Sequence, residues 1–270
     1  MSLAELSVII PCYRCSDTIE RAVLSVDKQS MRPAELILVD DCSTDSTLKI
    51  LQAIQQAYGE QWVKIIALEE NIGCGGARNK GWDLATMPYV AFLDADDVWV
   101  KQKVEIQLNW MKSHPDVMYT GHPANVLAED HFQPADLIGE PAFKRVHWLH
   151  LLLSNRFAAA SIMAKRNMTY RYAPDGRRRT EDYLLSCEIC LDGHPIYRCT
   201  EYLGAYHKAP FGAGGLSEDL WLMEKSELGI YRYLYRKKSL GLLTMILSQA
   251  FSLVKYFRRV AIVVLLRARK

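Results

Sequence analysis

The stretch "AELILVDDCSTDSTLKILQAIQQAYG" at residues 34–59 pairs a buried strand with an amphipathic helix. Its first part is a short apolar run ending in two carboxylates, Asp40 and Asp41, and its length and composition predict a strand covered on both faces. Ser43 can cap the helix that follows, and Gly59 is a suitable stop. This strand–helix unit is the building block of an α/β domain with a largely parallel sheet.

The unit recurs on both sides of this stretch. Short apolar runs predict further strands at 6–13, 63–70 and 89–97, and helical patterns follow the first two of these at 16–29 and 73–85. Right-handed crossovers between such strands place all their carboxyl ends at one edge of the sheet. Because ligands bind beyond that edge in open α/β sheets, we expect the residues at the strand ends to line one cleft.

The bulk composition is that of an ordinary globular protein. The chain has 270 residues, 50% hydrophobic and 24% charged, and its net charge of +2 gives no case for a nucleic-acid partner. Two C-x-x-C pairs, Cys12/Cys15 and Cys187/Cys190, leave zinc or redox sites open. The two pairs lie far apart in the chain, however, and reduced thiols in a cytosolic protein are the favoured interpretation. The opening residues do not resemble a secretory signal peptide.

We expect one domain at 1–225 and a basic helical tail at 226–270. From Leu228 onward the chain contains no acidic residue. Its apolar stretches, 240–254 and 260–266, are shorter than the roughly 20 residues that a membrane-spanning helix needs. Aromatic, Lys and Arg residues around them suit a helix lying on an anionic membrane surface. A helix that docks on the domain or on a second subunit is the alternative.

A D-x-D motif follows the strand predicted at 89–97. Asp94 and Asp96 in "VAFLDADDVW" are oxygen ligands that suit Mg²⁺ or Mn²⁺ bound together with substrate phosphates. A surface turn with a helix cap explains the same residues equally well. Phosphatases of the haloacid dehalogenase type also use D-x-D after a strand, but normally near the N-terminus.

Two further motifs suit a nucleotide. Asp40 and Asp41 end their strand, where a carboxylate can accept from a base N–H or from ribose hydroxyls. In "NIGCGGARNKG" (71–81), glycines precede Arg78 at a helix start, a place that favours anions. A tight turn is the plain alternative for these glycines.

Two motifs in the second half have catalytic and structural interpretations. In "TED" at 180–182, Glu181 and Asp182 fit the first turn of a helix, and Asp182 could also serve as a general base. In "YHKAPFGAGG", His207 fits a core histidine, a metal ligand or a phosphate contact, on a loop whose glycines could let it close over a ligand.

Taken in order, these motifs resemble the family 2 glycosyltransferases of bacterial polysaccharide biosynthesis, which have the GT-A fold. The resemblance runs from residue 6 to about 217 and rests on "SVIIPCYRC", "VDDCSTDST", "NIGCGGARNKG", "FLDADDVW" and "TED". Two positions depart from the family pattern: Arg14 stands where Asn is usual, and Cys42 stands where Gly is usual.

The resemblance implies a GT-A fold with a Rossmann-like, mostly parallel central sheet flanked by helices. It further implies a metal-dependent, inverting hexosyl- or N-acetylhexosaminyl-transferase that uses Mn²⁺ or Mg²⁺. The implied roles are nucleotide-sugar binding for Pro11, Tyr13, Asp40, Asp41, Arg78 and Asp94, metal binding for Asp96 and His207, and general-base catalysis for Asp182.

The partners implied are a UDP-linked donor and a lipid-linked saccharide acceptor of a growing surface polysaccharide. The protein would then be peripheral on the cytoplasmic face of the membrane, and a homodimer through the C-terminal helices is another use of the tail. A sugar-nucleotide nucleotidyltransferase is a rival, but "PCYRCSDT" lacks the glycine-rich phosphate loop it needs. A non-catalytic membrane adaptor that keeps the fold is a second rival.

Overall fold

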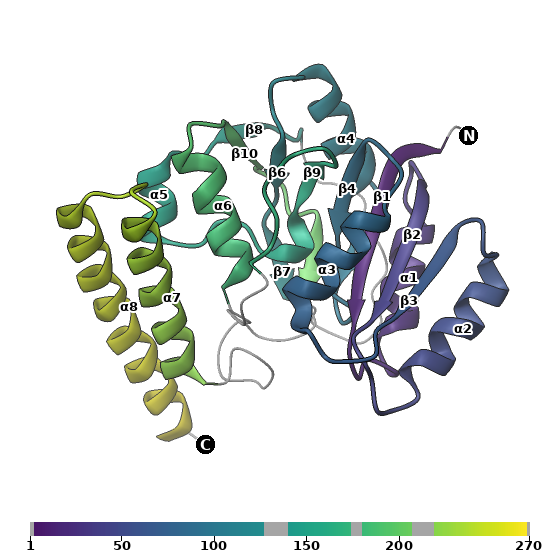
Figure 1. Cartoon of the computed structure of the whole chain (residues 1–270), viewed down its shortest axis with the longest axis horizontal. Helices are drawn as coiled ribbons and strands as arrows, with labels where there is room; N and C mark the ends of the chain where they lie inside the picture. Colours follow the sequence, from purple (N-terminus) through teal and green to yellow (C-terminus); the bar gives the residue numbers. More distant parts are fainter. Residues whose placement is uncertain (1–2, 127–139, 174–179, 207–218, 269–270) are drawn as a thin grey trace.

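The computed structural model describes residues 3–126, 140–173, 180–206 and 219–268 (Figure 1). The first part alternates strands and helices in the predicted order: β1 (Ala4–Cys12), α1 (Ile19–Asp27), β2 (Pro33–Asp40), α2 (Thr47–Tyr58), β3 (Val63–Ala67), α3 (Gly73–Leu84) and β4 (Tyr89–Phe92). The remaining elements are β5 (Val98–Trp99), α4 (Lys103–Ser113), β6 (Tyr119–Gly121), β7 (Ala124–Val126), β8 (Phe143–Arg145), α5 (Trp148–Leu153), a 3₁₀ turn (Ala159–Ser161), β9 (Met163–Lys165), α6 (Glu181–Leu191), β10 (Ile196–Cys199), β11 (Gly204–Tyr206), α7 (Leu220–Arg236) and α8 (Leu242–Ala268).

The strands form a large mixed sheet and a small one. The large sheet has the order β3-β2-β1-β4-β9-β6-β10-β8, and β5-β11-β7 form the second sheet. Strands β3, β2, β1 and β4 are mutually parallel, and β10 is parallel to β6. Strand β9 runs antiparallel to both of its neighbours. The predicted α/β fold with a mostly parallel central sheet is therefore confirmed.

Both faces of the large sheet are covered, which explains why its central strands are apolar almost throughout. Side chains alternate along a strand, so neighbouring residues enter different cores. Ile9 and Ile37 belong to the core shared with α3 and α6. Val8 and Leu36 belong to the opposite core, which is shared with α1, α2 and α4.

Helix α3 packs very closely on the sheet because Gly81 has no side chain. A Cβ atom at Gly81 would lie only 2.4 Å from Ile9 Cγ2. The close approach holds this part of α3 against β1 and β2, since the same Cβ atom would lie 3.2 Å from Val39 Cγ2.

The strand predicted at 89–97 is shorter than expected. Strand β4 ends at Phe92, and the Asp97 N–H then donates to the Asp94 carbonyl oxygen at 3.1 Å, closing a turn. The acidic motif is consequently a turn between β4 and β5 and does not continue the strand. Asp94 and Asp96 are only half-buried there, which lowers the cost of placing two carboxylates together, whereas Asp97 is buried.

The C-terminal part is helical, as predicted. Helices α7 and α8 form a hairpin that lies beside α5 and α6 (Figure 1, left). The expected domain boundary at residue 225 falls inside α7. Within the part of the chain that the structure describes, every helix is too short or too polar to cross a membrane.

Candidate active site

The carboxyl ends of β1 and β2 form one side of the site. Pro11 is buried within β1, and the next strand residue, Cys12, pairs with Asp40 of β2. The Tyr13 side chain, just past the strand, is 46% exposed and offers an aromatic face to solvent. Pro11 thus supports the strand end, whereas Tyr13 is accessible to a ligand.

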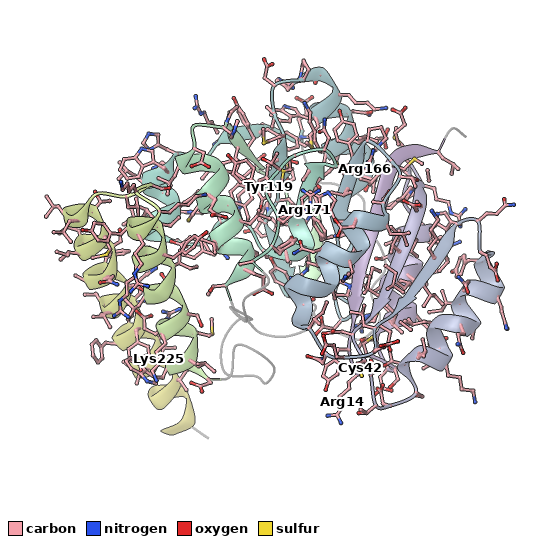
Figure 2. The ribbon with its side chains drawn as sticks, viewed as in Figure 1. Arg14, Cys42, Tyr119, Arg166, Arg171 and Lys225 are labelled. Atoms are coloured by element: carbon pink, nitrogen blue, oxygen red, sulfur yellow. The ribbon has the colours of Figure 1, made fainter. Side chains whose placement is uncertain are left out.

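Two backbone outliers lie side by side at this edge (Figure 2). Arg14 and Cys42 adopt φ values of +50° and +59°, a conformation that Asn and Gly tolerate best. These are the two positions at which the chain departs from the family pattern. The Arg14 side chain is held by Thr44 Oγ1, which accepts from Nη2 at 2.9 Å.

Asp40 and Asp41 have different surroundings, although they are adjacent. Both side-chain oxygens of Asp41 accept hydrogen bonds from the backbone: Oδ1 accepts from the Ile72 N–H at 2.7 Å and Oδ2 from the Gly73 N–H at 2.9 Å. Asp41 therefore shapes the entry to α3. Asp40 is buried, and its Oδ1 has no hydrogen-bond partner among the residues that the structure describes. A buried carboxylate oxygen without a partner is costly, so a ligand donor at this point would stabilise it.

Arg78 joins the two halves of the site. Its guanidinium is 5% exposed and donates to Asp94 Oδ1 at 2.6 Å and to Glu181 Oε1 at 3.3 Å. The Tyr172 ring lies below it, 5.3 Å from the guanidinium carbon. The expected role of Arg78 in binding the donor stays a prediction; in the structure its guanidinium forms ion pairs with two carboxylates of the protein. Its contacts bring the turn after β4 to the start of α6.

The acidic turn lies beside this bridge. Asp94 is held by Arg78, and Asp96 is half-buried, with its carbonyl oxygen accepting from Arg21 at 3.0 Å. No group of three or more His, Cys, Asp or Glu side chains suited to a metal ion is found among the described residues. His207, the second predicted metal ligand, lies outside the described residues.

Asp182 is half-buried at the first turn of α6. Burial, and next the charge of Glu181, raise the pKa of its carboxyl to about 6 from an ordinary 3.8. Its Oδ1 accepts from the Tyr183 N–H at 2.8 Å, and its Oδ2 accepts from Asn155 Nδ2 at 3.2 Å. A carboxylate with this pKa is ionised at neutral pH and still basic enough to take a proton.

Three site residues were not identified from the sequence. Glu181 stands in "TED" and was interpreted only as a first-turn acid, whereas it pairs with Arg78. Burial raises the pKa of the Tyr206 phenol, and the charges of Asp97, Asp94 and Asp182 raise it further. Tyr206 therefore marks the place where the acidic turn and α6 come close.

The third unidentified residue is Asn155, which holds Asp182 from the loop after α5. Its neighbourhood, "LLLSNRF", contains no motif, so the sequence carried no signal for this contact.

Comparison with known proteins gives a family match. The family model described as "Glycosyl transferase family 2" matches residues 7–175. A relative named as the teichuronic acid biosynthesis glycosyltransferase TuaG of Bacillus subtilis (strain 168) is 32% identical over 238 residues, covering 86% of this chain and 88% of its own. The Escherichia coli protein WfaP, named as a UDP-Glc:α-D-GlcNAc-diphosphoundecaprenol β-1,3-glucosyltransferase, is 28% identical over 83% of this chain and 84% of its own.

Solved structures share the fold. S. aureus TarS (residues 1–349) in complex with UDP-GlcNAc has a TM-score of 0.69 at 19% identity, covering 94% of this chain and 72% of that one. The mannosyltransferase PcManGT from Pyrobaculum calidifontis, in complex with GDP-Man and Mn²⁺, has a TM-score of 0.65 at 15% identity, covering 97% and 75%. At these identities the likeness concerns the fold alone.

Proposed function

The chain belongs to glycosyl transferase family 2 and is a glycosyltransferase, and on this premise we propose that it moves a sugar from a UDP-linked donor to a hydroxyl of a lipid-linked saccharide, with inversion at the anomeric carbon. The observation that carries this proposal is the Arg78 bridge, which joins Asp94 to Glu181 and so brings the acidic turn to the proposed base, Asp182. The names of two relatives support a role in surface polysaccharide synthesis.

The donor nucleoside is assigned to the ends of β1 and β2. The unpartnered Oδ1 of buried Asp40 can accept from the base N–H, and the exposed Tyr13 ring can cover the base or ribose. Pro11 and Asp41 would support these two residues indirectly: Pro11 supports the end of β1, and Asp41 binds the backbone of Ile72 and Gly73. WfaP takes UDP-Glc by its name, and TarS binds UDP-GlcNAc, which favours UDP as the carrier.

A divalent cation, Mn²⁺ or Mg²⁺, is assigned to Asp96, with Asp94 and His207 as further candidates. Such ions keep several waters and need only one or two protein carboxylates when substrate phosphates complete the shell, and the oxygen donors of the acidic turn fit that requirement. Bound there, the ion would supply charge stabilisation for the departing diphosphate.

Asp182 is the proposed general base. Its carboxylate accepts the proton of the acceptor hydroxyl as the hydroxyl oxygen bonds to the anomeric carbon. The bond from that carbon to the diphosphate oxygen breaks on the opposite face, and its electron pair leaves with UDP. One displacement inverts the configuration, and no covalent bond to the protein forms.

The hairpin supports a peripheral position on the cytoplasmic face of the membrane. Helix α8 directs Ser252, Lys255 and Arg259 toward the protein, where Arg259 donates to buried Glu224 at 2.7 Å. Its outer face is apolar, the reverse of an ordinary surface helix. Eight large apolar side chains there are 41% to 71% exposed, namely Leu242, Leu243, Ile246, Leu247, Phe251, Val254, Phe257 and Ile262.

Positive charge around this face favours an anionic bilayer as its occupant. Arg236, Lys238 and Arg258 are exposed near the apolar stripe, and the chain has no acidic residue after Glu227. The acceptor named for WfaP, a diphosphoundecaprenol-linked sugar, resides in such a bilayer and suits this position.

Flotation with vesicles tests the membrane assignment. We expect the protein to float with vesicles that contain phosphatidylglycerol, and a Leu247→Glu/Val254→Glu variant to stay behind. A dimer in solution that the same variant dissociates, without vesicle binding by the wild type, would instead assign the face to a second copy.

A screen of UDP-sugars tests the transfer itself. We expect metal-dependent UDP release with at least one donor, and none from Asp182→Asn. An Asp182→Asn protein that transfers sugar at the wild-type rate would refute the assignment of the base.

A further inference from the structure

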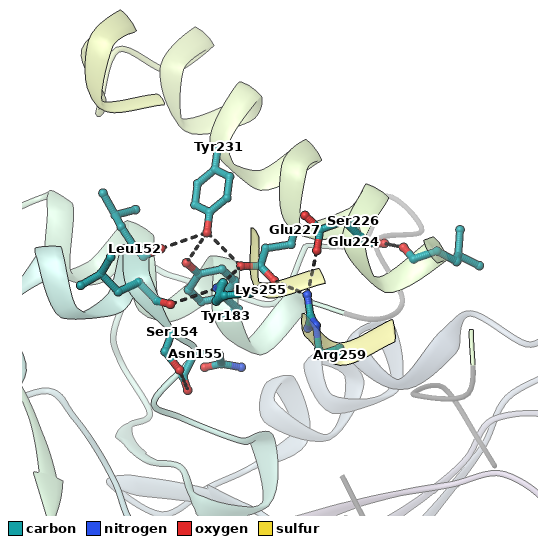
Figure 3. Close-up of polar contacts among 12 residues, drawn as sticks. Leu152, Ser154, Asn155, Tyr183, Glu224, Ser226, Glu227, Tyr231, Lys255 and Arg259 are labelled. Carbon is teal, nitrogen blue, oxygen red and sulfur yellow. Dashed lines mark hydrogen bonds and ion pairs between the residues drawn. The ribbon is translucent and has the colours of Figure 1, made fainter. Parts of the chain in front are cut away.

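The end of α5 is held by side chains from three other helices (Figure 3). The last carbonyl groups of a helix lack partners within it. Here the Leu151 oxygen accepts from the Tyr183 hydroxyl at 2.8 Å, and the Leu153 oxygen accepts from Lys255 Nζ at 3.0 Å. The Leu152 oxygen lies 3.0 Å from the Tyr231 hydroxyl, so α6, α7 and α8 each supply one group.

The two hydroxyls, which are buried, form one cluster with Lys255 and with Glu227 of α7, which are half-buried. Glu227 Oε1 lies 3.0 Å from the Tyr231 hydroxyl and 2.7 Å from Lys255 Nζ, and the Tyr231 hydroxyl lies 3.2 Å from that of Tyr183. Burial opposes the ionisation of Glu227, but Lys255 outweighs it and the pKa of the carboxyl is lowered. The cluster therefore stays charged and ties the hairpin to the end of α5.

Asn155 follows Leu153, the last residue of α5, by two positions, and its side chain contacts Asp182. Asn155 Oδ1 accepts from the Phe157 N–H at 3.0 Å, which fixes the orientation of the amide. The amide nitrogen must then point the other way, and it donates to Asp182 Oδ2 at 3.2 Å. With the Tyr183 N–H on Oδ1, both oxygens of the carboxylate are oriented.

We propose that Asn155 is a positioning residue that orients the Asp182 carboxylate, and that the α7–α8 hairpin holds Asn155 in place through the end of α5. This inference rests on the proposed role of Asp182 as the base. It gives the hairpin a part in catalysis in addition to the proposed membrane contact: α7 and α8 influence the geometry of the base without contacting it.

Replacing Asn155 by Asp probes its contact with Asp182, and replacing it by Ala, which adds no charge, separates positioning from simple loop structure. Asp keeps the acceptor for the Phe157 N–H but cannot donate to Asp182, and it adds a negative charge beside that carboxylate. Both changes favour the protonated base. We expect the acidic limb of the kcat–pH profile to move up by about one pH unit or more, with kcat at neutral pH reduced at least about tenfold and the donor KM unchanged.

The alternative outcome is equally specific. The charge that Asn155→Asp adds moves the profile whatever the role of Asn155, so the uncharged Asn155→Ala is the deciding variant. It removes the donor to Asp182 Oδ2, and we expect its acidic limb also to move up. If Asn155 only stabilises its loop, Asn155→Ala keeps the wild-type pH profile, and the inference is overturned. Asp182→Asn, measured alongside, distinguishes this from failure of the proposed function. An inactive Asp182→Asn with an unmoved Asn155→Ala profile rejects only the positioning role, whereas an active Asp182→Asn rejects the base.

The hairpin part is tested by Tyr231→Phe and Lys255→Met. Each removes a contact to the end of α5, and we expect kcat to fall several-fold with an unchanged donor KM, at a temperature where circular dichroism shows the variant folded. Lys225→Met, an exposed change on α7, is the matched control and should leave kcat unaltered. Wild-type kcat in both test variants would show that the hairpin does not position the base.

Discussion

Replacing Asp182 by Asn should stabilise the fold at neutral pH while abolishing transfer. Burial and the charge of Glu181 raise the pKa of the Asp182 carboxyl from 3.8 to about 6 in the folded chain. Because the pKa is higher in the folded chain than in the unfolded one, ionisation of Asp182 lowers the free energy of unfolding above about pH 6. This destabilisation disappears as the pH falls toward 4. A pKa difference of this size corresponds to about 3 kcal/mol.

Asp182→Asn removes this cost of ionisation, but it also loses a hydrogen bond. The Asn amide can accept from only one of the two N–H groups that bind the carboxylate, those of Asn155 and Tyr183, which costs about 1 kcal/mol. We therefore expect Asp182→Asn to raise the free energy of unfolding by about 2 kcal/mol near pH 8, and by nothing near pH 4.

Urea unfolding followed by circular dichroism at several pH values measures this difference. Asp116→Asn, on an exposed residue, is the control and should change stability little at any pH. A stability difference for Asp182→Asn that is the same at both ends of the pH range would refute the reasoning, since it would leave no role for a raised pKa.

Three further substitutions, one of them with a control in α2, test the architecture around the site. Cys42→Gly relieves a left-handed backbone at φ +59° and should stabilise the fold by up to about 1 kcal/mol in urea unfolding, whereas Ala53→Gly within α2 should destabilise it by a similar amount. Arg78→Lys leaves one of two carboxylates without its partner, and we expect the free energy of unfolding to fall by about 3 kcal/mol and activity to be lost. Unchanged thermal stability would contradict the role of Arg78 in joining Asp94 to Glu181. Gly81→Ala places a Cβ atom 2.4 Å from Ile9 Cγ2 and should cost about 1–3 kcal/mol by the same unfolding measurement, and a neutral result would show that α3 can shift.

The fold of the first hundred residues could be predicted because local pattern and global fold agree there. The run "AELILVDD" is apolar from Leu36 to Val39, and β2 ends at Asp40. The turn after β4 was harder to predict. Asp94 follows a strand pattern without a break, and its turn is set by a hydrogen bond from Asp97, which the pattern does not show.

The partners of the site residues could not be predicted, because they depend on packing between distant segments. Arg78 was expected to face the donor, since a helix start with glycines favours anions. Its pairing with Glu181 joins residues that lie 103 positions apart, and a Cβ atom at Gly75 would lie 3.3 Å from Glu181 Cγ. Asn155 lacked any sequence signal, because its contact with Asp182 joins two segments that lie 27 residues apart in the chain.

One measurement tests the central claim most directly: UDP binding and UDP release, followed in parallel for wild type, Asp96→Asn and Asp182→Asn, with Mn²⁺ and a panel of UDP-sugars and lipid-linked acceptors. We predict that Asp182→Asn binds UDP as the wild type does but transfers no sugar, and that Asp96→Asn loses the part of UDP binding that depends on the metal. Wild-type transfer by Asp182→Asn, or Mn²⁺-dependent UDP binding that survives in Asp96→Asn, would contradict the account.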